Sequence, residues 1–282
     1  MKQGVQLKYD ARDKAWSYHK NKFGAPMPML LPKTLGRKRE TPYNQFLTYL
    51  CTAYSTAMAG QYRNRVQMSP EWQSGKVSEK VGSTIAHEGA DPRQAMKAAI
   101  VWGHLPQNLT DVTLLAKGED FVAQWINYPL KLDSEAIKYH PSGYMPILNE
   151  KGNRFDSIRS AMYNEWLAHG DNAWPVCLAT DWYPECAHER VTTLSALKTS
   201  AHMYMAIDYA TFDGQDWLLI QSSEGDGSFR WFSRDVVNKL FENPAAFAAI
   251  FTVDDRNRQN VITEALLTLY YALLNYYSDI MK

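Results

Sequence analysis

The chain has 282 residues, of which 45% are hydrophobic and 21% charged, a composition typical of a globular protein built as one large domain or two packed lobes. Thirty basic and thirty acidic side chains cancel, so no global charge attracts nucleic acid or an anionic membrane. No apolar run reaches the roughly 18 residues of a membrane span. We therefore expect neither nucleic acid nor membrane as a partner.

The cysteines predict free thiols. The chain has three cysteines, Cys51, Cys177 and Cys186. Their number is odd and no two of them form a CxxC pair, so a disulfide framework is not indicated. The first eight residues are mixed and polar, which does not fit a secretory signal. We expect a reducing location, either the cytoplasm or the interior of a larger particle that carries the protein.

Residues 1–44 predict an extended N-terminal arm. Pro26, Pro28, Pro32 and Pro42 interrupt any long helix there. The basic run from residue 33 to residue 39 has no interleaved aromatic side chains, which favours a solvated loop over a phosphate-binding segment.

Residues 45–170 predict a helical lobe. Apolar and small residues recur at helical spacing from Cys51 onward, and Gly60 weakens this helix without ending it. Two further helices are expected where Ser69 or Asp91 stands as N-cap before a proline, the second ending near residue 103. Helical spacing also predicts a helix over residues 155–169, and a short helix is expected over residues 121–128.

Residues 171–242 predict a β lobe. Apolar stretches indicate strands over 175–180, 201–209, 217–222 and 229–232, with a turn at Asp213-Gly214. Residues 243–282 predict a C-terminal extension, in which 243–252 form a helix or a strand and 261–281 an amphipathic helix. That helix docks on its own chain or on a partner protein. Helices followed by strands make an α+β protein.

Cys51 is the first candidate for chemistry. A cysteine in the first turn of a helix lies beside unpaired N–H groups and the positive end of the dipole, which favour the reactive thiolate. Gln45, six residues earlier, could donate a hydrogen bond to the oxyanion formed at an attacked carbonyl. The alternatives are a buried small hydrophobe at Cys51 and a loop amide that caps a carbonyl at Gln45.

Several motifs occur in a suggestive order. After Gln45 and Cys51 come Ala53-Tyr54-Ser55, Met68-Ser69-Pro70-Glu71, Glu88-Gly89-Ala90-Asp91-Pro92, Trp174-Pro175-Val176, Ala201-His202 through Tyr209, and Trp217-Leu218-Leu219-Ile220-Gln221-Ser222-Ser223-Glu224-Gly225. This order, over roughly residues 8–235, resembles the papain-like (cathepsin-type) cysteine peptidases, of which the chain would be a divergent member.

The resemblance implies an α+β, papain-like two-lobe fold with the active site in the cleft between a helical lobe and an antiparallel sheet or barrel lobe. It implies Cys51 as nucleophile, His202 as base and Gln45 as oxyanion donor, acting on a polypeptide substrate. The substrate would lie along the glycine turn at Gly89. Three neighbours are expected to line the same cleft, namely Glu88, Tyr49 and Ala201.

The chain departs from the family at important positions. Ser222 replaces the asparagine that holds the histidine, and Gln221 or Asp208 are alternative residues for that task. Glu224 replaces the shielding tryptophan, Thr52 replaces the tryptophan after the cysteine, and Tyr49 replaces a glycine, which narrows the cleft. Taken alone, His202 on an apolar strand also fits an ordinary core histidine.

Two hypotheses follow for function. The first is a thiol hydrolase that cleaves a peptide or isopeptide bond. The second is a catalytically weak or inactive papain-fold subunit of a larger assembly, for example a viral or phage particle, which binds a protein partner through the arm and the C-terminal helix.

Metal and cofactor sites are not indicated. Glu165 and His169 lie four residues apart on a helix without a third ligand, which favours a surface pair. The loop of Cys186-Ala187-His188-Glu189 resembles a zinc site only weakly. We expect no cofactor.

Overall fold

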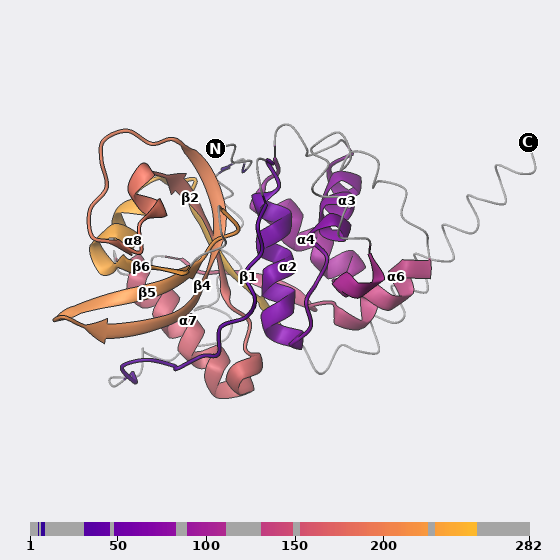
Figure 1. Ribbon diagram of the computed structural model, residues 1–282, viewed down its shortest axis with the longest axis horizontal. Coiled ribbons are helices and arrows are strands. Elements are labelled where there is room, and N and C mark those ends of the chain that lie inside the picture. The colour runs from indigo at the N-terminus through magenta and orange to yellow at the C-terminus, as the bar shows by residue number, and fades with distance from the viewer. Residues whose placement is uncertain are drawn as a thin grey trace, which may run out of the picture.

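A computed structural model describes residues 5, 7–8, 31–45, 48–82, 89–110, 131–148, 153–224 and 229–252. Figure 1 shows two lobes, with the sheet and helices α7 and α8 in one half and helices α2, α3, α4 and α6 in the other. The predicted α+β, two-lobe organisation is confirmed.

The helical lobe begins where the sequence predicts. Its helices are α2 (Cys51–Asn64), α3 (Pro70–Val81), α4 (Pro92–Trp102) and α6 (Lys131–Ala136). Ser69 caps α3 by accepting from the Trp72 N–H at 3.0 Å, and Asp91 caps α4 by accepting from the Arg93 N–H at 2.8 Å. The N-cap and proline pattern therefore placed both helix starts correctly.

Helix α2 is the central element of the molecule, because α3 and α4 contact it in the helical lobe and strand β4 contacts it from the other lobe. Gly60 allows one of these close approaches. A Cβ atom at Gly60 would lie 2.7 Å from Cγ of the buried His104 ring. The glycine that looked like a weak point of the helix is therefore needed for packing.

The sheet has the strand order β1-β7-β2-β4-β5-β6-β3 within the described residues. The strands are β1 (Gly143–Pro146), β2 (Val176–Trp182), β3 (Arg190–Val191), β4 (Ser200–Phe212), β5 (Gln215–Gln221), β6 (Phe229–Ser233) and β7 (Phe247–Thr252). Pairing is antiparallel except between β3 and β6. Asp213 and Gly214 both have positive φ, as the tight hairpin between β4 and β5 requires.

The sheet extends beyond the predicted β lobe of 171–242. Strand β1 comes from the range predicted as helical lobe, and β7 comes from the predicted C-terminal extension. Strand β7 inserts between β1 and β2, so segment 243–252 contributes a strand rather than a helix. Helix α7 (Arg154–His169) also packs against β2, β4 and α8 (Arg234–Leu240). The boundaries at 170 and 242 therefore need correction.

Short 3-10 helices complete the described elements: η2 (Gln107–Leu109), η5 (Ile137–Tyr139), η6 (Gly170–Asn172) and η7 (Pro184–Ala187). The helices predicted over 121–128 and 261–281 lie outside the described residues, as does most of the predicted arm.

The described part of the arm runs between the two lobes (Figure 1). The Asp208 carboxylate on β4 accepts the backbone N–H of Leu35 at 3.0 Å and that of Arg37 at 3.2 Å. The Arg37 guanidinium donates to the Ala173 carbonyl and lies 4.7 Å from the centre of the Tyr62 ring on α2. Arg37 is buried, so this part of the basic run joins the lobes rather than forming a solvated loop.

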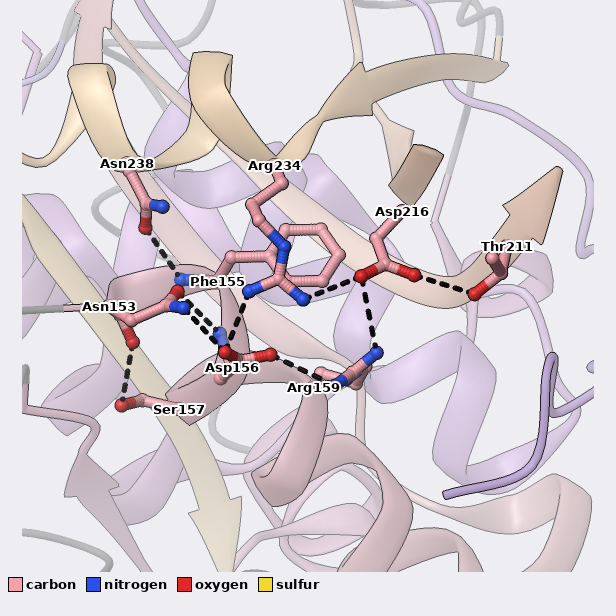
Figure 2. Close-up of polar contacts among 9 residues, drawn as sticks. All are labelled: Asn153, Phe155, Asp156, Ser157, Arg159, Thr211, Asp216, Arg234 and Asn238. Carbon is pink, nitrogen blue, oxygen red and sulfur yellow. Dashed lines mark hydrogen bonds and ion pairs between the residues drawn. The ribbon is translucent and has the colours of Figure 1, made fainter. Parts of the chain in front are cut away.

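A polar network holds the β4–β5 hairpin to both helices of the β lobe (Figure 2). Arg234 at the start of α8 donates to Asp156 on α7 at 2.6 Å and to Asp216 on β5 at 2.5 Å. Arg159 forms an ion pair with Asp156 at 2.9 Å, and Thr211 donates to Asp216 at 2.6 Å. Two arginines and two aspartates balance in charge, which fits a structural role.

Candidate active site

Cys51 is the first residue of α2. The N-cap residue, Leu50, provides no side-chain cap, and the first turn contains no acidic residue. Cys51 therefore lies at the positive end of the helix dipole. The Cys51 side chain is fully buried.

His202 contacts Ser222, the first residue after β5. Its Nε2 atom lies 2.8 Å from Ser222 Oγ, at the end of β5. The backbone N–H of Glu224 donates to the same oxygen at 3.1 Å. The serine at the asparagine position therefore contacts the ring nitrogen that the resemblance assigned to it.

Gln45 is joined to the residue that follows Ser222. The Gln45 N–H donates to the Ser223 carbonyl at 2.8 Å, and Ser223 Oγ donates to Gln45 Oε1 at 2.7 Å. Gln45 Nε2 donates to the Thr48 carbonyl at 3.0 Å. One turn after β5 thus holds the histidine through Ser222 and the segment before Cys51 through Ser223.

Helix α2 meets strand β4 close to the two candidate residues. Ser55 Oγ donates to the Met203 carbonyl at 2.8 Å. Ser55 lies one helical turn after Cys51, and Met203 is the neighbour of His202 in the chain. His202 Nδ1 has no hydrogen-bond partner among the described residues. This nitrogen is the one left over once Nε2 contacts Ser222.

An aromatic side chain that sequence reasoning missed covers His202. The ring of Trp182 lies 4.7 Å from the His202 ring, centre to centre, at 62°. Trp182 pairs with Ser200 across β2 and β4, and it lies on the same face as His202 two residues further along β4. Only the cross-strand register reveals this contact, and no local sequence signal marks it.

Burial controls the charge of His202. Complete burial lowers its pKa to about 3, and the nearby Arg230 cation contributes in the same direction. Arg230 forms an ion pair with Glu224 at 3.9 Å, and both side chains are about 95% buried. In this structure His202 is therefore a neutral imidazole at neutral pH.

The predicted substrate-binding residues are only partly placed. Gly89 has φ +68°, so it forms the left-handed turn before α4 that the sequence predicts. Its neighbour Ala90 makes a parallel β-bridge with Val5. Tyr49 and Ala201 are half-buried. Glu88 lies outside the described residues.

The two alternative partners for His202 are excluded by their positions. Asp208 accepts backbone N–H groups of the arm and of Tyr209. Gln221 alternates with Ser222 and so points to the opposite face of the sheet. Neither alternative therefore contacts the histidine.

Metal ligands do not cluster in the described part of the chain, where no group of three such side chains could hold an ion. His169 Nε2 lies 3.5 Å from Glu165 Oε2, and because Glu165 is buried, the prediction of a surface pair is wrong for this residue. Cys177 and Cys186 are free and buried, and burial raises the pKa of each thiol to about 12. None of the described helices is long and apolar enough to cross a membrane.

Comparison of whole structures gives the fold. Xylellain, a cysteine protease from Xylella fastidiosa, has a TM-score of 0.66 at 15% identity, over 90% of this chain and 97% of its own. The chain has the papain-like fold. Procathepsin L2 from the larval midgut of Tenebrio molitor gives 0.61 at 14% identity over 89% and 78% of the two chains. The cysteine protease CMS1MS2 of Carica candamarcensis, in complex with E-64, gives 0.50 at 12% identity over 79% and 100%.

No family model matches the sequence, and no curated protein matches it. The papain-like fold is thus shared at 12–16% identity with cysteine proteases, and the resemblance of the sequence motifs is confirmed at the level of the fold.

Proposed function

We propose that the chain is a thiol hydrolase that cleaves a peptide or isopeptide bond, with Cys51 as nucleophile and His202 as base. One observation carries the proposal: consecutive residues of one turn, Ser222 and Ser223, contact His202 and Gln45. Gln45 is part of the segment that leads into Cys51. This arrangement supports a site in which base, oxyanion donor and nucleophile act together.

The chemistry follows from the positions of the donors. Cys51 Sγ attacks the carbonyl carbon while its proton passes to His202 Nδ1. The oxyanion accepts hydrogen bonds from the Cys51 backbone N–H and from the side-chain amide of Gln45. His202 then returns the proton to the leaving amine, and water hydrolyses the thioester to release the acid and restore the thiol.

The backbone next to Gly89 can pair with an extended polypeptide. Val5 of the chain itself forms a β-bridge with Ala90. Main-chain pairing at an open edge is a common way to bind a substrate strand. We infer that a polypeptide substrate pairs along the same edge.

The residues of this proposed site are buried. Cys51 and His202 have no exposed surface, and Gln45 and Ser222 are buried with them. Turnover therefore requires a conformation in which the covering segments have moved aside. The three buried thiols support function in a reducing compartment, either the cytoplasm or a larger particle.

A second candidate is a papain-fold subunit without turnover, bound to a protein partner in a larger assembly. The complete burial of Cys51 and the neutral His202 favour it. The arm does not support this second candidate where Thr34, Leu35 and Arg37 donate hydrogen bonds to Asp208 of the same chain.

Turnover of peptides separates the two candidates. The full chain is incubated with a fluorogenic peptide mixture, beside Cys51→Ala and the matched control Cys177→Ala, which removes another buried thiol. Hydrolysis that survives in the control and is lost in Cys51→Ala supports the hydrolase. Equal rates in all three proteins, or no hydrolysis by the unmodified chain, would favour the subunit.

A further inference from the structure

One side-chain hydrogen bond ties helix α2 directly to strand β4, near Cys51 and His202. Ser55 Oγ donates to the Met203 carbonyl at 2.8 Å, although the two residues are 148 positions apart in the chain. Both residues are completely buried. The bond therefore crosses the seam between the two lobes in the interior of the protein.

The Ser55 hydroxyl donates to the other lobe rather than to its own helix. A serine or threonine inside a helix commonly donates to the carbonyl four residues earlier, which for Ser55 is that of Cys51. Thr56, the next residue, does donate within α2, to the carbonyls of Thr52 and Ala53. Two adjacent buried hydroxyls of α2 thus have different tasks, and that of Ser55 lies between the lobes.

Met203 lies just beyond the point where β5 stops pairing with β4. Strand β5 ends opposite Met205, and the chain that follows turns toward Gln45, whose N–H donates to the Ser223 carbonyl. Strand β2 still pairs with β4 along the part that carries His202. That part of β4 is therefore positioned by β2 and, through Ser55, by α2.

The bond lies close to both proposed reacting groups. Ser55 follows Cys51 by four residues, about 6 Å along the helix axis, and residues four apart share a face of a helix. Met203 follows His202 by one residue, about 3.3 Å along the strand. The arm also contacts β4, at Asp208, but that contact is about 20 Å along the strand from His202, beyond a β-bulge. The Ser55 contact is therefore the nearer of the two to the proposed site.

We propose that Ser55 is a positioning residue for the hydrolysis proposed above, on which this inference rests: its bond to the Met203 carbonyl fixes the distance between Cys51 Sγ and the His202 ring. Helix α2 and strand β4 are regular over the few residues concerned, so a shift at this bond reaches the pair almost undiminished. A misplacement of reacting groups by about 1 Å can cost about 10²-fold in rate. Ser55 takes no part in the proton transfer itself.

Alkylation of the full chain by iodoacetamide at pH 7, followed at each cysteine by mass spectrometry, tests the proposal without a substrate. Ser55→Ala should lower the rate at Cys51 about tenfold and leave the rate at Cys177 unchanged. Thr56→Val is the matched control, because it removes the neighbouring buried hydroxyl that donates within α2, and it should change neither rate. In a His202→Ala background, Ser55→Ala should have no further effect, because Ser55 acts through the pair.

The direction of the change separates positioning from a role in stability alone. Loosened packing between the lobes would expose the buried thiols and raise the rates at Cys51 and Cys177, with or without His202. A Cys51 rate that is unchanged or raised in Ser55→Ala, or lowered equally in Thr56→Val, would overturn the proposal. If Ser55→Ala fails to fold, Ser55→Cys, which keeps a weak donor of similar size, is judged by the same outcomes, with fragment masses identifying Cys51.

Peptide hydrolysis is a separate readout. Ser55→Ala should lower kcat about tenfold and leave KM unchanged, because the pair acts after the substrate has bound. A chain in which Cys51 responds as expected but no peptide is cleaved refutes the proposed function alone. Hydrolysis with the same kcat in Ser55→Ala refutes the positioning role alone, and a Cys51 rate that does not depend on His202 refutes both.

Discussion

Ser223 donates a hydrogen bond to the side-chain oxygen of Gln45 at 2.7 Å, one residue away from the serine that contacts His202. A single turn at the end of β5 therefore joins the segment that precedes the nucleophile to the base. Because this turn contacts both His202 and Gln45, residues 222–224 position the proposed base and the proposed oxyanion donor together.

Ser222→Ala removes the oxygen that contacts His202 Nε2. The ring loses its orientation, and the Glu224 N–H loses its acceptor. We expect kcat for peptide hydrolysis to fall at least about tenfold, since a positioned base contributes 10²-fold or more. Steady-state kinetics measure the change. Ser222→Asn, which restores the residue of the papain-like family, should recover activity; a Ser222→Ala protein as active as the unmodified one would remove Ser222 from the site.

Gln45→Ala removes the proposed oxyanion donor. The loss of hydrolytic activity should appear in kcat and not in KM, because the oxyanion exists only in the transition state. The expected decrease in kcat is about 10²-fold. Ser223→Ala is the informative partner variant. It keeps the Gln45 amide but loses the 2.7 Å contact, so its decrease should be smaller. A rise in KM alone on Gln45→Ala would assign Gln45 to ground-state binding instead.

His104 makes stability depend on pH. Burial, with a smaller contribution from His140, lowers its pKa to about 3. A lowered histidine pKa means that the unfolded chain binds a proton below about pH 6.5 that the folded chain excludes. The free energy of unfolding should therefore fall as the pH drops from about 6.5 toward 3, by up to about 1.4 kcal/mol per unit for this group.

Urea unfolding at several pH values measures that slope. His104→Leu keeps a side chain of similar volume between Gly60 and the rings of Trp174 and Phe251. We expect a shallower decrease between pH 6 and pH 4 than in the unmodified chain. Parallel curves for the two proteins would show that His104 does not contribute.

The network of Figure 2 should couple α8 to the β4–β5 hairpin. Arg234 and Asp216 lie 2.5 Å apart, and both side chains are partly exposed. A double-mutant cycle with Arg234→Met and Asp216→Asn should give a coupling energy of about 0.5–1 kcal/mol that decreases in high salt. A coupling energy near zero at low salt would mean that the contact does not stabilise the fold.

The sequence predicts those parts of the proposed site that local rules and motif order determine. A helix start indicates Cys51, and motif order and spacing indicate His202, Gln45 and Ser222. The structure adds Ser223, which donates to Gln45 from far along the chain, and Trp182, whose position depends on which residues of β2 and β4 face one another. No single segment carries that information.

The sequence does not predict strand β1 and leaves β7 open between helix and strand, for a physical reason. Gly143-Tyr144-Met145-Pro146 is short and ends in proline, and Phe247-Ala248-Ala249-Ile250 contains alanine, which is common in helices. Each becomes a strand because it pairs with the other, and β7 also pairs with β2. Tertiary pairing overrides weak local preference here.

The most direct test of the central claim, that Cys51 and His202 act as a pair, is the rate at which iodoacetamide modifies each cysteine, followed by mass spectrometry at pH 7. We predict that Cys51 reacts at least about tenfold faster than Cys177, whose pKa burial raises to about 12, and that His202→Ala abolishes the difference. Equal and slow modification of Cys51 and Cys177, unchanged by His202→Ala, would contradict the account.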